Sequence, residues 1–224
     1  MNERRAAFPF AMGGLAFACF LLVLVFMAKT VQPLWGRTLL LLLPALLLFG
    51  VGVLARKGIP GPEKTAVVTA ILSIVLLVLS VFYVFLLSVW TATTTTMDTK
   101  YYARAYRQID DRACVGECFP AAVPEDAADV LFSYCPQFLQ GGEEFRLSYR
   151  TTEEKLAEWS GRLAAAAEWV GPDEEWLRLH QQLPGDPGPV RYQLYGEGFS
   201  NHGEECFVRI DPDGSRIEFN YSRW

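Results

Sequence analysis

Long uninterrupted runs of apolar residues occupy the first part of the chain and predict three membrane-spanning helices. Residues 6–28, 38–55 and 65–90 carry no charged side chain, and an α-helix needs about 20 mostly apolar residues to cross the roughly 30 Å hydrocarbon core of a bilayer. None of the runs has a polar face at helical spacing, which argues against helices of a water-soluble core. We therefore expect a membrane region over residues 1–97.

The remainder, residues 98–224, has the mixed pattern of a folded domain. Residues 99–112 place apolar side chains at helical spacing and predict an amphipathic helix that continues the third span. Residues 145–150 alternate strictly between apolar and polar side chains, which is typical of a half-buried strand. The β-type run 129–135 precedes it, and we expect the two to pair as a hairpin across residues 136–142.

Two helices and three strands are predicted after this hairpin. Thr151 with Glu154 forms a capping-box pattern at the start of a helix that reaches Gly171, and a shorter helix begins at Asp173. The strands are expected at residues 190–195, 206–210 and 216–221, the last two flanking the turn sequence from Asp211 to Gly214. This pattern predicts an α+β domain with an antiparallel sheet of about five strands and one or two helices on one face.

Charge is distributed unevenly along the 224 residues and predicts an orientation. Before Thr91 there are seven basic and two acidic residues, and the remainder has 13 basic and 23 acidic ones. Lys and Arg in short flanks of membrane spans are retained in the cytoplasm, and the amino terminus and the second loop hold five of them against two in the first loop. We expect a multi-pass protein of the cell membrane with a cytoplasmic amino terminus and an extracytoplasmic carboxyl-terminal domain. The lipid bilayer is its expected partner, and the acidic balance argues against nucleic acid.

Four of the five cysteines fall in the predicted outer domain. They are Cys114, Cys118, Cys135 and Cys206. An extracytoplasmic location favours two disulfides, and we expect the first two cysteines to join the last two, because a bridge over three intervening residues constrains little chain. Free buried thiols and a metal site with His202 or His180 are the open alternatives. The cysteine spacing offers no compact ligand pair, so neither a metal nor a cofactor is predicted.

A candidate catalytic region surrounds His202, with Glu204, Glu205 and Cys206 nearby. A Cys/His nucleophilic pair needs a third orienting group and an oxyanion hole, and no local signature supports them. The acidic residues 173–175 are interpreted as structural, because negative charge is favourable at a helix amino terminus. A glycine-rich phosphate loop and a nucleophile elbow are both missing. We therefore assign no catalytic residue.

A short pattern between Phe119 and Gly142, FPxxxPxxA followed by FxYxPxxxQGG, resembles uncharacterised membrane-anchored bacterial proteins of unknown function. The resemblance implies no activity, but it singles out the connection after the first predicted strand. Loops on a rigid scaffold often carry function, so Pro136, Gln140, Gly141 and Gly142 form a candidate recognition loop. The alternative is a hairpin connection that needs Pro and Gly for its shape.

The leading hypothesis is a membrane protein without enzymatic activity, whose outer domain is a binding or interaction module for another membrane or envelope protein, an envelope component or a small ligand. One alternative is an enzyme with an unfamiliar site near His202 and Cys206. Another is an accessory subunit of a membrane complex that uses Gly50 and Gly52 for helix contacts, because small residues let helices approach closely. No ionisable side chain lies inside a predicted span, which leaves a transport function without support.

Overall fold

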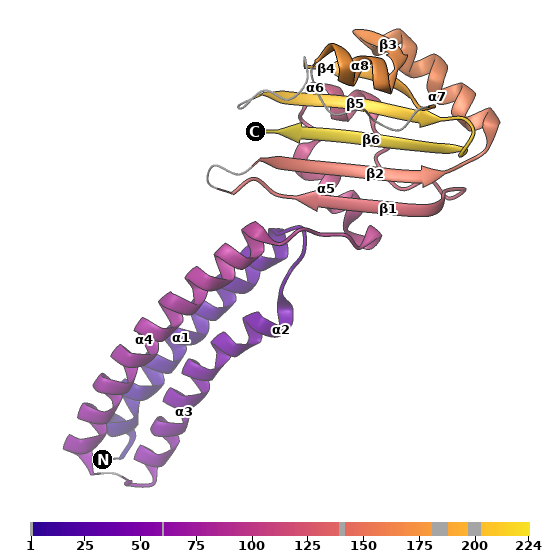
Figure 1. The fold of residues 1–224 in the computed structure, drawn as a ribbon. Coiled ribbons are helices and arrows are strands. Elements are labelled where there is room, and N and C mark those ends of the chain that lie inside the picture. The colour runs from indigo at the N-terminus through magenta and orange to yellow at the C-terminus, as the bar shows by residue number, and fades with distance from the viewer. Residues whose placement is uncertain (1, 60, 139–141, 181–187, 197–202) are drawn as a thin grey trace. The chain divides into compact units, whose positions relative to one another are not determined.

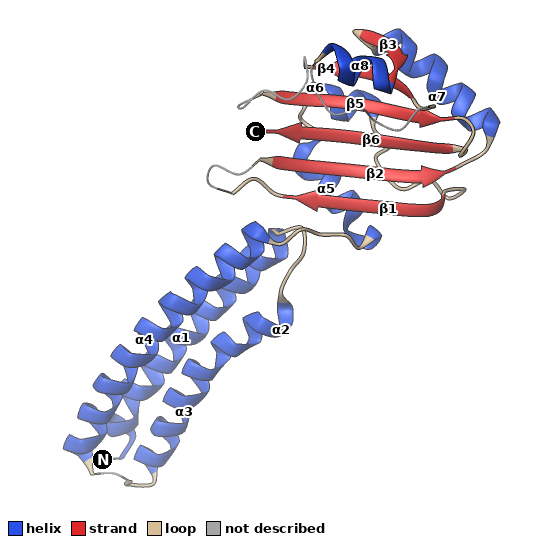
Figure 2. Cartoon of the chain, viewed as in Figure 1, coloured by secondary structure: helices blue, strands red, loops and turns tan. Residues whose placement is uncertain are grey.

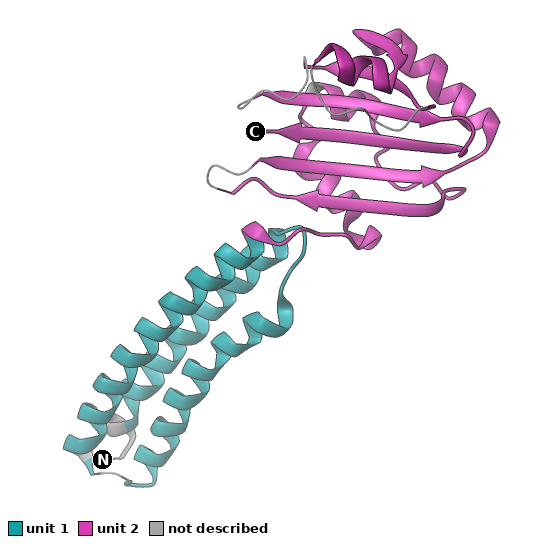
Figure 3. Ribbon diagram, in the orientation of Figure 1, with its two compact units in different colours: residues 1–91 teal, residues 92–224 magenta. Residues whose placement is uncertain are grey.

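The structure is a computed structural model of the whole chain (Figure 1). It describes residues 2–59, 61–138, 142–180, 188–196 and 203–224. The chain divides into two compact units, Met1–Thr91 and Ala92–Trp224 (Figure 3).

Long apolar helices build the first unit (Figure 2). The elements are α1 (Asn2–Lys29), α2 (Trp35–Thr38), the 3-10 helix η1 (Leu39–Leu42), α3 (Leu43–Arg56) and α4 (Pro62–Thr93). The stretches Ala6–Lys29, Trp35–Arg56 and Glu63–Thr93 are each long and apolar enough to cross a membrane. Most of their large apolar side chains are exposed, as expected where lipid is the solvent. These helices form the membrane-spanning region that the sequence predicts.

Helices α1 and α3 pack closely through two glycines. A Cβ atom at Gly52 would lie 3.0 Å from the ring of Phe10, and one at Gly13 would lie 2.9 Å from the ring of Phe49. Gly52 is therefore used within the chain. A Cβ atom at Gly50 would meet nothing within 4 Å, so this glycine is the one of the predicted pair that stays open to a partner helix.

The second unit is a six-stranded antiparallel sheet with helices. The strands are β1 (Ala128–Cys135), β2 (Glu143–Arg150), β3 (Trp169–Pro172), β4 (Val190–Tyr195), β5 (Glu204–Asp211) and β6 (Arg216–Arg223). The helices are η2 (Thr99–Tyr101), α5 (Tyr102–Ile109), α6 (Ala113–Cys118), α7 (Glu153–Ala166) and α8 (Asp173–Leu179). The strand order is β1-β2-β6-β5-β4-β3. The predicted α+β architecture is confirmed, including the β1–β2 and β5–β6 hairpins.

An aromatic core fills one face of this sheet. Phe145 of β2 is fully buried, and its ring centroid lies 5.4 Å from that of Tyr102 on α5 and 5.6 Å from that of Phe132 on β1. Trp159 of α7 packs edge-on against Phe219 of β6 at 5.1 Å. Figure 1 shows α5 and α6 behind the sheet, whereas α8 lies in front of its β3–β4 end. Among the described helices labelled in this domain, α8 is therefore the one on the face opposite the aromatic core.

Three local predictions are corrected by the structure. The predicted long helix ends at Ala166, and Trp169–Pro172 forms a sixth strand because it pairs with β4. The helix expected to continue the third span is separate from it, because Thr96 instead bridges to Tyr134 of β1. The cap of α7 is Thr152, whose side chain accepts a hydrogen bond from the Lys155 amide.

Buried tyrosines make the domain sensitive to alkali. Burial raises the pKa values of Tyr102, Tyr134 and Tyr221, and it raises that of Tyr149 to about 12. An unfolded tyrosine ionises near pH 10, so a raised folded-state pKa stabilises the domain fully below about pH 10. This contribution to the free energy of unfolding is lost as the pH rises toward 12. We expect these four side chains to ionise in the same pH range in which the β-sheet circular dichroism signal is lost. Ionisation of all tyrosines near pH 10 in a folded domain would contradict this expectation.

Candidate functional site

The face of the sheet opposite the aromatic core carries a regular grid of mainly polar side chains. Successive side chains of a strand point to opposite faces, so the residues that alternate with the buried aromatic residues along each strand point away from the core. The registers align three rows across β2, β6 and β5: Glu144, Ser222, Glu205; Arg146, Asn220, Phe207; and Ser148, Glu218, Arg209. Asn220 is the centre of this grid.

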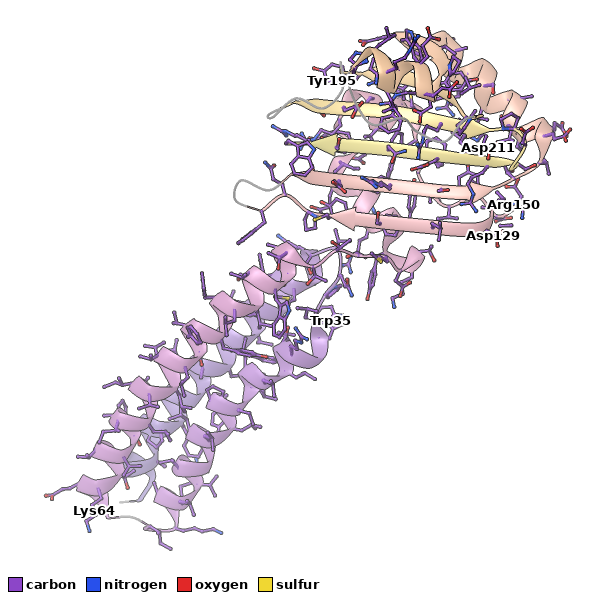
Figure 4. All side chains as sticks on the ribbon, in the orientation of Figure 1. Trp35, Lys64, Asp129, Arg150, Tyr195 and Asp211 are labelled. Carbon is purple, nitrogen blue, oxygen red and sulfur yellow. The ribbon has the colours of Figure 1, made fainter. Side chains whose placement is uncertain are left out.

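A cleft of about 230 Å³ lies over the grid. Its walls are formed by Asp173 and Leu177 of α8, Arg191 of β4 and Trp224, which follows β6. We call it the open-face cleft. Arg150 lies outside it, at the end of β2 beside Asp129 of β1 (Figure 4), although it shares the strand and the face of Arg146.

A buried ion network holds one wall of the open-face cleft. The carboxylate of Asp173, which is 1% exposed, accepts hydrogen bonds from Arg191 Nη1 at 3.1 Å and from Arg209 Nη1 at 3.2 Å. Arg191 also pairs with Glu205, and its Nε atom donates to Gln193 at 2.8 Å. Burial lowers the pKa of Arg191, and the two carboxylates oppose that effect. Buried charged side chains that are hydrogen-bonded to one another have few alternative positions. This wall of the cleft is therefore preorganised.

Hydrogen-bond donors remain for a ligand at the centre of the grid. Asn220 is 7% exposed, and its Nδ2 atom has no partner among the residues that the structure describes. A buried donor without a partner costs about 1–3 kcal/mol, so such groups call for an explanation. The neighbouring Arg146 is 57% exposed and has one ion pair, at 3.5 Å to Glu144. Asn220 and Arg146 therefore place two groups with N–H donors side by side in one row of the grid.

The predicted disulfides are not formed, and all five cysteines are free thiols. Cys206 is buried on the core face of β5, where burial raises the pKa of its thiol and the nearby Cys114 raises it further. Cys135 follows Tyr134, which points into the core, so its own side chain points to the other face. The sheet therefore separates Cys135 from Cys114 and Cys118, its predicted partners. Within the described ranges, no cluster of three or more ligating side chains could hold a metal ion.

The candidate recognition loop meets the open-face cleft at its described end. Gln140 and Gly141 lie outside the described residues, and Pro136 follows directly after β1. A Cβ atom at Gly142 would lie 2.8 Å from the Trp224 ring and 2.7 Å from the Arg223 carbonyl oxygen. Gly142 therefore gives the space that the Trp224 wall requires.

The candidate catalytic region is divided by the sheet. His202 lies outside the described residues. Cys206 points into the core, whereas Glu205 points into the open-face cleft and pairs with Arg191. A fully buried thiol with a raised pKa is a poor nucleophile, because the thiolate is the reactive form.

No protein-family model, curated protein or solved structure matches the chain. The chemistry of the open-face cleft is therefore the basis for assigning a function. Sequence patterns alone did not single out Asn220, Arg146 or Arg191, because their association depends on strand order and register. The alternation of polar with apolar residues along β2 and β6 was the available signal.

Proposed function

We propose that this chain is a multi-pass membrane protein that presents a ligand-binding domain on the extracytoplasmic side. The distribution of Lys and Arg around the spans supports this orientation. The observation that carries the binding role is Asn220, a nearly buried amide in the lining of the open-face cleft, whose Nδ2 atom has no partner among the described residues. Preorganised clefts with a few convergent polar groups are typical of small-ligand sites.

A comparison of two charge reversals tests the binding role. Full-length protein in lipid nanodiscs is incubated with a soluble extract of the cell envelope, and bound small molecules are identified by mass spectrometry. We expect a compound that wild type and Arg150→Glu retain and that Arg146→Glu loses, because Arg146 lines the cleft and Arg150 does not. Equal retention by Arg146→Glu would contradict the proposal. Both arginines are exposed, at 57% and 55%, so neither variant is expected to unfold the domain.

A further inference from the structure

We infer that the open-face cleft recognises one ring of a neutral carbohydrate, an inference that rests on the proposed function and names its ligand class. The charge balance of the cleft, its hydrogen-bonding groups and its aromatic wall each favour this ligand class.

The charges of the cleft are nearly balanced and already paired. Arg191 and Arg209 share the carboxylate of Asp173, and Arg146 pairs with Glu144. A strongly charged ligand would compete with these pairs, and breaking a buried one would leave its partner uncompensated. The balance therefore favours a neutral polar ligand over a phosphate or a polyamine.

Donors and acceptors alternate across the grid. Asn220 stands between Arg146 in its own row and Glu218 two positions along β6. A hydroxyl group both donates and accepts hydrogen bonds, so one sugar hydroxyl can accept from Asn220 Nδ2 while it donates to a neighbouring carboxylate. Adjacent hydroxyls of one sugar ring repeat this pairing of a donor with an acceptor at several positions. A ligand with a single amide or carboxylate group offers it at one position at most.

The aromatic wall suits the apolar face of a sugar ring. Trp224 is 40% exposed and lines the cleft, and an aromatic ring presents a flat apolar surface with a polar edge. The volume of about 230 Å³ is below the roughly 300–1,000 Å³ of sites for drug-sized ligands. It matches one ring, with the rest of a longer chain extending into solvent.

Calorimetry with defined probes tests the inference. Full-length protein in lipid nanodiscs, free of sugar-headed detergent, is titrated with the neutral sugars triacetylchitotriose and maltotriose. Trialanine and N-acetylphenylalanine are titrated as a peptide and an organic anion. We expect at least one trisaccharide to bind. Asn220→Asp, which replaces the donor by a carboxylate, and Arg146→Gln should each weaken that binding by about tenfold or more. Arg150→Gln should leave it unchanged, and a thermal melt verifies that Asn220→Asp is folded.

The possible outcomes separate this inference from the proposed function. Trisaccharide binding that both cleft variants weaken supports the inference. Binding of the peptide or the anion alone, weakened by Arg146→Gln, overturns the carbohydrate assignment and leaves the binding role standing. Trisaccharide binding that neither cleft variant changes overturns it as well. If no probe binds, the carbohydrate assignment is overturned, and the envelope-extract comparison decides whether the binding role also fails.

Discussion

Replacement of Asp173 by alanine should lower the free energy of unfolding of the α+β domain by about 3–5 kcal/mol, the usual cost of removing one partner from a buried ion pair. The side chain is 1% exposed and lies between Arg191 and Arg209. Its loss leaves Arg191, which is 3% exposed, with Glu205 as its remaining carboxylate partner. Urea denaturation of the full chain in micelles, followed by circular dichroism of the sheet, measures the change.

Glu174→Ala is the matched control for this experiment. Glu174 is the next residue of α8, has the same charge and is exposed, so its loss should cost less than about 1 kcal/mol through the helix dipole. Equal effects of the two substitutions would mean that the Asp173 carboxylate is solvated. The preorganised wall of the open-face cleft would then have no basis.

Phe145→Ala should destabilise the same domain by about 3–5 kcal/mol, because it removes a large buried ring and leaves a cavity. The ring is fully buried and lies within 6.2 Å, between ring centroids, of Tyr102, Phe119, Phe132 and Tyr134. Domains are commonly stable by only about 5–15 kcal/mol, so this variant should unfold at a much lower urea concentration.

Leu131→Ala, on the neighbouring strand, is the control for the core substitution. Leu131 is 65% exposed, and a surface substitution of this kind usually changes stability by less than about 0.5 kcal/mol. The same denaturation experiment compares the two variants. A small effect of Phe145→Ala would show that β2 does not pack against α5 as described.

Local patterns were sufficient to predict most elements of the fold. Strict alternation identified β2, and the turn sequence after Asp211 identified the β5–β6 hairpin, because both signals lie within a few residues. The helix prediction extended to Gly171 and so included part of β3, because the strand character of Trp169–Pro172 depends on pairing with β4. The separation of η2 from the third span likewise depends on the bridge between Thr96 and Tyr134, which no local pattern reveals.

The site was harder to predict than the fold, since its residues come from distant segments. Asp173 was interpreted as a favourable charge at a helix terminus, and its location in α8 agrees with that. Its pairing with Arg209, 36 positions later in the chain, follows only from the order β6-β5-β4-β3. The number of cysteines favoured disulfides, but alternation along β1 turns Cys135 away from the core face, on which its predicted partners lie.

The exposure of the open-face cleft outside the cell is the claim on which the account depends most. Its most direct test is labelling of intact cells with a membrane-impermeant thiol reagent in two variants, Arg146→Cys in the cleft and Lys57→Cys in the loop before α4, with each site scored by mass spectrometry of its peptide. We expect labelling at position 146 in intact cells, and at position 57 only after permeabilisation. The reverse pattern would contradict the proposed orientation and transfer the search for a ligand to the cytoplasm.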